Sequence, residues 1–150
     1  VLRTHQPPDT EQTVTFDRLG GAGFGDRANN KKVEDAAMQA VRRHLEKRGY
    51  KVFDVSRRNV GWDLTAYRSR DQHLRYVEVK GVSGTQEKVL LTANEINRAD
   101  DNKEWELAIV TSALSDPKIH FYGVTALDER MYVLVWQADL TTATPRKEEA

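Results

Sequence analysis

The chain has 150 residues, 39% of them hydrophobic and 31% charged, which is typical of one soluble globular domain with a core of its own. Lysine plus arginine balance aspartate plus glutamate at 23 each, so bulk positive charge does not predict nucleic-acid binding, although a local basic surface around an acidic centre stays open. The absence of cysteine excludes disulfides and cysteine-ligated zinc, and the four histidines have no metal-ligand spacing. No apolar run is long enough to span a membrane and no signal-peptide pattern begins the chain, so we expect an intracellular, cytoplasmic protein without a membrane partner.

Both ends of the chain are polar. Residues 1–26 are predicted to be a linker or irregular segment, and their glycine-rich run 19–25 fits neither the P-loop nor the dinucleotide-binding pattern. Residues 141–150 form a polar tail, which leaves residues 27–140 as the domain. We expect this chain to be a piece of a larger protein.

The first predicted element is a helix over residues 28–48. Apolar residues recur with helical spacing along one face, and Gly49 follows two basic residues, which is typical of a helix end. The members of this stripe are Val33, Ala36, Ala37, Ala40, Val41, His44 and Leu45. We interpret His44 as a packed core residue.

Glu34 lies beside this stripe. One interpretation is a boundary glutamate favoured by the helix dipole near the N-terminus. The other is an accessory acid that leans over the sheet toward Asp63 and Glu78.

A strand over residues 50–55 follows, with alternating character, and residues 56–60 then lead into a hairpin. Arg57, Arg58 and Asn59 are candidates for nucleic-acid binding, because two arginines beside an acidic centre can hold phosphates with paired hydrogen bonds. Ordinary loop charges are an equal alternative.

The most informative stretch is residues 61–81. Its two arms, 61–67 and 74–81, are rich in aromatic and β-branched residues, and a short polar connector over 68–73 predicts an antiparallel hairpin. If the connector closes symmetrically, Asp63 lies opposite Glu78.

Lys80 shares a strand face with Glu78, so Asp63, Glu78 and Lys80 are predicted to converge on one patch. Two opposed carboxylates repel each other, and a divalent cation would offset that repulsion. Mg²⁺ prefers oxygen ligands and often takes only one or two carboxylates. The alternative for the Glu-x-Lys pattern is a solvated ion pair, and a β-bulge would change the register.

Residues 89–91 are a short apolar strand or the entry to a helix. Thr92 and Glu95 have the spacing of a capping box, which predicts a helix to about Asp101. Asn94 and Glu95 are accessory candidates for the site, although the cap alone explains Glu95.

Three further strands are predicted at 105–111, 119–124 and 131–136, and the last two could instead belong to a buried helix. The resulting fold class is α/β, with an α-β-β-β-α-β core, extra C-terminal β-strands and helices on the faces of a mixed sheet.

This layout resembles the PD-(D/E)XK nuclease superfamily. More narrowly, residues 61–64, 76–81 and 91–95 resemble the domain family named for the C-terminus of the plant NO VEIN protein, and the likeness covers about residues 32–124. Trp62 stands where the superfamily pattern has a proline.

The resemblance implies a restriction-endonuclease-like fold and Mg²⁺-dependent phosphodiester cleavage of DNA, with Mn²⁺ able to substitute. Asp63 and Glu78 would bind the metal, Lys80 would orient or activate the attacking water, and Glu34 would be an accessory acid. The resemblance also implies a module of a larger restriction, phage-defence or DNA-processing protein, with helicase-like or ATPase-like domains as partners and a homodimer left open. Two alternatives are an inactive nuclease-fold domain that binds nucleic acid or a protein, and a structural domain in which Glu78 and Lys80 are a surface pair.

Overall fold

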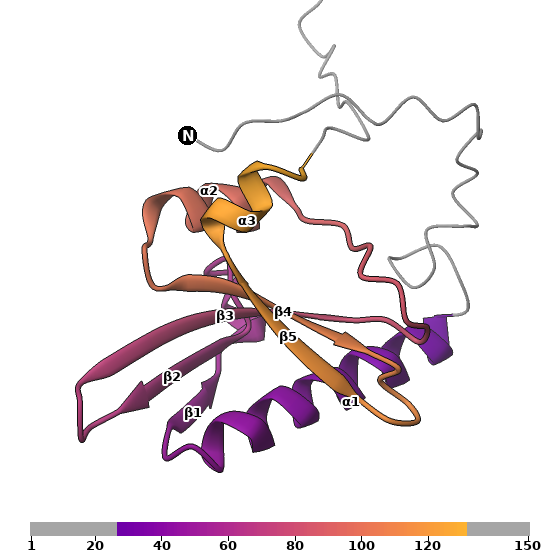
Figure 1. Ribbon diagram of the computed structural model, residues 1–150, viewed down its shortest axis with the longest axis horizontal. Helices are drawn as coiled ribbons and strands as arrows, with labels where there is room; N and C mark the ends of the chain where they lie inside the picture. Colours follow the sequence, from indigo (N-terminus) through magenta and orange to yellow (C-terminus); the bar gives the residue numbers. More distant parts are fainter. Residues whose placement is uncertain (1–26, 132–150) are drawn as a thin grey trace, which may run out of the picture.

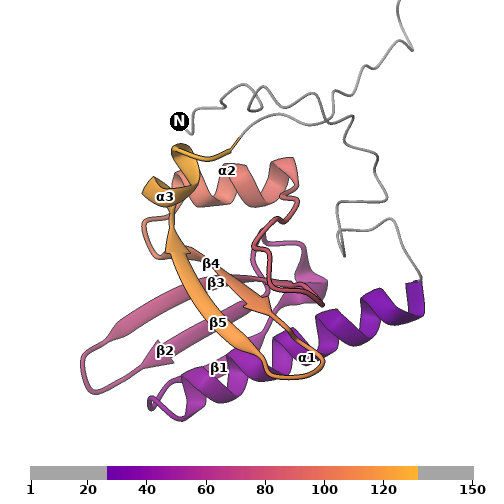
Figure 2. The same cartoon turned by 45° about the vertical axis from the view of Figure 1, so that its right-hand side comes forward.

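Five strands form one mixed sheet in the computed structural model, which describes residues 27–131 (Figure 1). The strands lie in the order β1-β2-β3-β4-β5. Helix α1 covers one face of the sheet, and α2 and α3 lie on the other side, as Figures 1 and 2 both show. The elements are α1 (Arg27–Glu46), β1 (Lys51–Asp54), the 3₁₀ turn η2 (Ser56–Arg58), β2 (Leu64–Arg68), β3 (His73–Gly81), α2 (Ala93–Asp101), β4 (Trp105–Thr111), β5 (Lys118–Gly123) and α3 (Val124–Asp128).

Helix α1 follows the predicted apolar stripe. Val33, Ala37, Val41 and Leu45 are buried against the sheet, where each large apolar side chain contributes about 1.5–3 kcal/mol. The helix ends at Glu46, and Gly49 closes the turn that follows: its φ of 84° lies in the left-handed region, and its N–H donates to the Glu46 carbonyl at 2.9 Å. His44 is half-buried and packs on an aromatic ring of β5, as the core interpretation predicts.

The hairpin of β2 and β3 has the predicted register. Leu64 faces Val77 at one end of the ladder and Arg68 faces His73 at the turn. Asp63 lies one residue beyond the last of these pairs, and its N–H donates to the Val77 carbonyl at 3.0 Å. The predicted register is confirmed, and it fixes which face of the sheet carries Asp63.

Strands β3 and β4 are parallel, with Tyr76 facing Trp105 and Gly81 facing Val110. A parallel pair needs a long crossover connection, and residues 82–104 provide it with α2 at its centre. This crossover places α2 on the face opposite α1. A second apolar cluster fills the space beneath it, with these buried members: Ala99, Trp105, Leu107 and Ile109.

The α-β-β-β-α-β order is confirmed, and β5 matches the strand predicted at 119–124 with bounds shifted by one residue. Val124 begins α3 instead of ending that strand, and the sequence did not predict this five-residue helix. Residues 89–91 belong to no strand and lead directly to the cap of α2. The strand predicted at 131–136, apart from Met131, the segment 1–26 and the tail 141–150 lie outside the described residues.

Within residues 27–131, no helix has both the length and the apolar character that crossing a membrane requires.

Candidate functional site

A cavity of about 860 Å³ opens where β2 begins and β3 ends. Its walls come from α1 between Lys31 and Arg42, from η2, from the crossover after β3 and from the first turn of α2. Four titratable residues at its centre come from three different elements: Asp63, Glu78, Lys80 and Glu95.

Asp63 is half-buried at the start of β2, and its Oδ2 accepts a hydrogen bond from the Val79 N–H at 2.9 Å. This bond holds the carboxylate against the C-terminal half of β3, where its negative charge acts on Glu78. Burial raises the pKa of Asp63 above its ordinary value, against the lowering effects of the Val79 N–H and of Lys80.

Glu78 is only 4% exposed although it is an acid on a strand that ends at an open cavity. Its Oε1 lies 2.9 Å from the Lys80 Nζ. Burial raises the pKa of Glu78 to about 8; the Lys80 ammonium opposes this rise, and the negative charges of Asp63 and Glu95 add to it.

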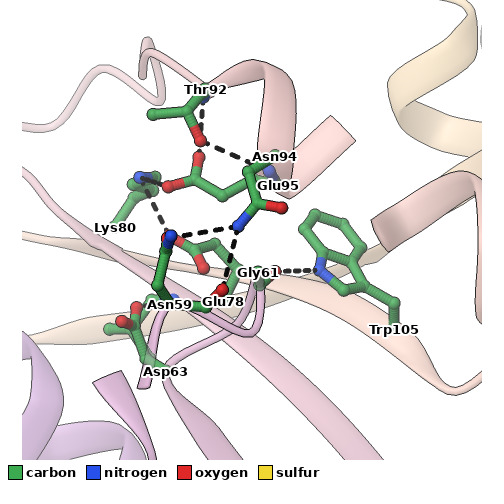
Figure 3. Close-up of polar contacts among 10 residues, drawn as sticks. Asn59, Gly61, Asp63, Glu78, Lys80, Thr92, Asn94, Glu95 and Trp105 are labelled. Atoms are coloured by element: carbon green, nitrogen blue, oxygen red, sulfur yellow. Dashed lines mark hydrogen bonds and ion pairs between the residues drawn. The ribbon is translucent and has the colours of Figure 1, made fainter. Parts of the chain in front are cut away.

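Lys80 pairs with two acids at once. Its Nζ lies 2.9 Å from the Oε1 of Glu78 and 3.1 Å from the Oε1 of Glu95. Dashed lines mark both contacts in Figure 3. Burial of the amine disfavours its charged form, but the two carboxylates outweigh burial and raise the pKa of Lys80. The ammonium is therefore charged at neutral pH.

Glu95 belongs both to the cap of α2 and to the acid cluster, by which we mean the carboxylates of Asp63, Glu78 and Glu95 around Lys80. Its Oε2 accepts from the Thr92 N–H at 2.8 Å, and its own N–H donates to the Thr92 Oγ1 at 3.3 Å, which is the predicted capping box. The cap alone does not describe Glu95, because its other oxygen binds Lys80. The sequence predicted the cap and made Glu95 an accessory candidate for the site, but it did not predict the contact with Lys80.

The loop before Asp63 has little freedom to move. Gly61 has a φ of 95°, and a Cβ there would lie 2.2 Å from the Cγ of Arg98 in α2. The Gly61 carbonyl accepts from the buried indole N–H of Trp105 at 3.0 Å. This loop therefore fixes where β2, and with it Asp63, begins relative to α2.

Glu34 and Arg57 line the same cavity from its outer side. Glu34 is exposed on α1 and is one of the residues that line the cavity. Arg57 is exposed on η2, whereas Arg58, its neighbour, does not line the cavity. Asp54 at the end of β1 also lines the cavity, a position that sequence reasoning did not single out; it accepts from the Ser56 N–H at 3.0 Å.

Asn59 and Asn94 contact each other. The Asn94 Nδ2 donates to the Asn59 carbonyl and side-chain oxygens, each at 3.3 Å, and Asn59 has a φ of 51°. These contacts join the loop before β2 to the first turn of α2. Within the described residues, neither amide bonds to the acid cluster, which indicates that this pair supports the site from outside.

One known protein family matches most of the described residues. Residues 33–122 match the profile of the family described as Protein NO VEIN, C-terminal, which covers more than half of the chain. The chain belongs to this family. The match includes Asp63, Glu78, Lys80 and Glu95 of the NO VEIN C-terminal domain. No curated protein and no solved structure matches the chain.

The donor set of this NO VEIN C-terminal domain fits a hard divalent cation with few protein ligands. No group of three or more His, Cys, Asp or Glu side chains within residues 27–131 is arranged as a metal site. The cavity instead offers two carboxylates, the half-buried Asp63 and the buried Glu78, since both oxygens of Glu95 are engaged. Mg²⁺ often binds one or two carboxylates and keeps water or substrate phosphate as its other ligands. Asp63 and Glu78 would hold such an ion.

The raised pKa of Glu78 predicts a pH-dependent stability. In the unfolded chain the pKa of the Glu78 carboxyl is near its ordinary value of 4.5, whereas in the folded protein the carboxyl keeps its proton up to about pH 8. The folded state thus binds more protons between these values, so this group's contribution to stability is lost as pH rises from about 4.5 to about 8. Asp63, with its raised pKa, acts in the same direction.

We expect Glu78→Gln to be more stable than the wild type at pH 8.5 and to lose this advantage at pH 4.5. Urea unfolding at a series of pH values, without divalent ions, measures the difference in stability between the two proteins. Glu129→Gln, at an exposed position on the last turn after α3, is the control and should follow the wild type at every pH. Parallel curves for the wild type and Glu78→Gln would contradict the assigned pKa.

Proposed function

We propose that this domain is a Mg²⁺-dependent nuclease module with a restriction-endonuclease-like fold that hydrolyses phosphodiester bonds of DNA. The observation that carries the proposal is the charge of the central cluster. Asp63, Glu78 and Glu95 supply three carboxylates and Lys80 one ammonium, which leaves two negative charges in excess when all are ionised. One divalent cation would balance that excess.

The raised pKa values of Asp63 and Glu78 support the same conclusion. Clustered acids that lack enough neighbouring positive charge keep their protons, which is why the pKa values of Asp63 and Glu78 are raised. Repulsion of this kind reduces the stability of the fold, so it points to a functional role for the cluster. A cation that binds here would replace those protons, which is the behaviour expected of a metal-ligand set.

Each residue has a distinct chemical task in this proposal. A bound Mg²⁺ would polarise the scissile phosphate and lower the pKa of the attacking water. Asp63 and Glu78 would hold the ion, and the hydrogen bond from the Val79 N–H orients the Asp63 carboxylate. Lys80 presents a compact positive charge to the water and to the negative charge that develops on the phosphate.

The substrate enters from the open side of the cavity. Arg57 on the rim can contact a phosphate next to the scissile one, and Glu34 faces the same space as an accessory acid. The choice of DNA over RNA, and membership in a larger defence or DNA-processing protein, rest on the family resemblance.

The deciding experiment compares the wild type with Asp63→Ala on supercoiled plasmid DNA in Mg²⁺, Mn²⁺ and Ca²⁺. We expect the wild type to nick or linearise the plasmid in Mg²⁺ and Mn²⁺, and Asp63→Ala to be slower by about 10³-fold or more, because the ion loses one of two protein ligands. Ca²⁺ should support binding in a gel-shift assay without turnover. Asp116→Ala, which changes an exposed aspartate on the turn before β5, is the matched control and should cleave like the wild type.

Thermal melting tests metal binding separately from cleavage. Mg²⁺ should raise the melting temperature of the wild type and of Asp116→Ala but not that of Asp63→Ala, since only a folded site binds the ion. Cleavage at equal rates by the wild type and Asp63→Ala would refute the proposal.

A second candidate is a nuclease-fold domain that binds nucleic acid or a protein without cutting. It is favoured by the Glu78–Lys80 pair, because the ammonium already occupies the carboxylate that a metal ion would need. DNA binding by the wild type with no cleavage and no Mg²⁺ effect on melting would support this candidate.

A further inference from the structure

We propose that Glu95 is a positioning residue that keeps the Lys80 ammonium in the site when the Glu78 carboxylate turns to a metal ion. The first turn of α2 then contributes one carboxylate, that of Glu95, to the site. This inference rests on the proposed function.

The Glu95 carboxylate is held at both of its oxygens. Oε2 accepts from the Thr92 N–H at 2.8 Å, and Oε1 lies 3.1 Å from the Lys80 Nζ (Figure 3). The first bond ties the carboxylate to the helix backbone, so it cannot follow the lysine if the lysine moves. Glu95 is thus a fixed anchor supplied by α2, whereas Glu78 is an anchor supplied by the same strand as Lys80.

Lys80 needs a second carboxylate partner because its first partner, Glu78, would also bind the metal ion. In the structure Lys80 pairs with Glu78 at 2.9 Å, and a carboxylate that binds a cation has less capacity to hold an ammonium beside it. A lysine has a flexible four-carbon stem and loses its place easily when its partner is withdrawn. Glu95 would keep the Lys80 ammonium in position, since its contact with Lys80 does not depend on Glu78.

An ordinary capping box explains only half of this geometry. The cap requires one oxygen of residue 95 to reach the Thr92 N–H, and the second oxygen could point to solvent. Instead it contacts an amine whose side chain is only 23% exposed and which lies between two acids. The proposal accounts for both oxygens.

The test separates the cap from the contact with Lys80 by three substitutions. Glu95→Gln keeps an oxygen for the Thr92 N–H but presents an amide N–H₂ to the ammonium, and Glu95→Ala removes both contacts. Thr92→Ala removes the hydroxyl half of the cap and leaves the Glu95 carboxylate in place.

The direct readout is the rate at which acetic anhydride modifies Lys80, measured by mass spectrometry relative to Lys103, whose side chain is 91% exposed. In Ca²⁺ alone we expect Lys80 of Glu95→Ala and Glu95→Gln to react about tenfold faster than in the wild type, the factor for losing one charge-assisted hydrogen bond. Thr92→Ala should lower the melting temperature and leave the Lys80 rate unchanged.

The kinetic readout is a kcat effect without a binding effect. Glu95→Gln should lower kcat for cleavage about ten- to hundredfold, while KM and the Mg²⁺ concentration for half-maximal rate stay as in the wild type, because Glu95 is not a metal ligand. A merely structural role would instead make kcat follow the melting temperature, with Thr92→Ala as slow as Glu95→Gln.

Failure of this inference can be distinguished from failure of the proposed function. Equal Lys80 modification in the wild type, Glu95→Gln and Glu95→Ala overturns the positioning role, whatever the cleavage assay gives. A wild type that cuts no substrate but still differs from both Glu95 variants in Lys80 modification overturns the nuclease assignment and leaves Glu95 as the anchor of the amine.

Discussion

Replacing Lys80 with alanine should abolish cleavage, with a rate at least about 10³-fold below the wild type, while DNA binding in Ca²⁺ stays within a few-fold. The reason is that the ammonium acts on the attacking water and on the charge of the transition state, whereas binding depends on contacts spread over the whole substrate. Single-turnover cleavage and a fluorescence binding titration on the same oligonucleotide measure the two quantities.

The fold should survive this substitution. Removing Lys80 leaves Glu78 buried without a partner, but a carboxyl with a pKa of about 8 takes up a proton at neutral pH instead of remaining as an isolated charge. Lys103→Ala, at a highly exposed lysine, is the control and should match the wild type in both assays. Loss of binding together with cleavage would indicate that Lys80 maintains the structure of the site.

Replacing Gly81 with alanine should destabilise the domain by about 1–3 kcal/mol, the usual cost of adding atoms to a packed interior. A Cβ at this position would lie 2.8 Å from the Ala37 Cβ and 2.9 Å from the Val33 carbonyl oxygen. Both neighbours belong to α1, and one of them is backbone, so neither moves without displacing the helix. Chemical denaturation measures the change.

Gly84 provides the matched control on the crossover that follows. A Cβ added there meets no atom within 4 Å, so Gly84→Ala should change stability by no more than about 0.5 kcal/mol. If the two substitutions cost the same, the close approach of β3 to α1 is not what Gly81 serves. Gly81→Ala should also reduce cleavage. The added Cβ would displace α1, which carries Glu34, and Gly81 itself lies next to Lys80 in the wall of the cavity.

Local sequence patterns determined the parts of this protein whose geometry repeats over a few residues. The stripe on α1 follows from the 3.6-residue helical period, and the register of β2 and β3 follows from the length of the turn between them. That register alone places Asp63 near Glu78 and Lys80. The cap of α2 followed from Thr92 and Glu95, three residues apart.

Tertiary structure decided the contacts between residues that are distant in the chain. The bond from Trp105 to the Gly61 carbonyl, 44 residues away, depends on how the crossover brings β4 beside β3. The same crossover lays α2 on the sheet face that carries Lys80, and only then does the second oxygen of Glu95 find the ammonium. A sequence period describes one element at a time, whereas these contacts depend on the packing of two.

The environment of each acid was likewise decided by packing. Nothing in the sequence marks Glu78 as 4% exposed, because a Glu-x-Lys pattern on a strand is equally typical of a solvated edge. Burial depends on the helices and loops that cover a strand end, and burial is what raises the pKa of Glu78. The sequence by itself therefore placed Asp63, Glu78 and Lys80 together. The tertiary structure added Glu95 to them and specified the charge of the acids, since charge depends on the water that the surrounding elements exclude.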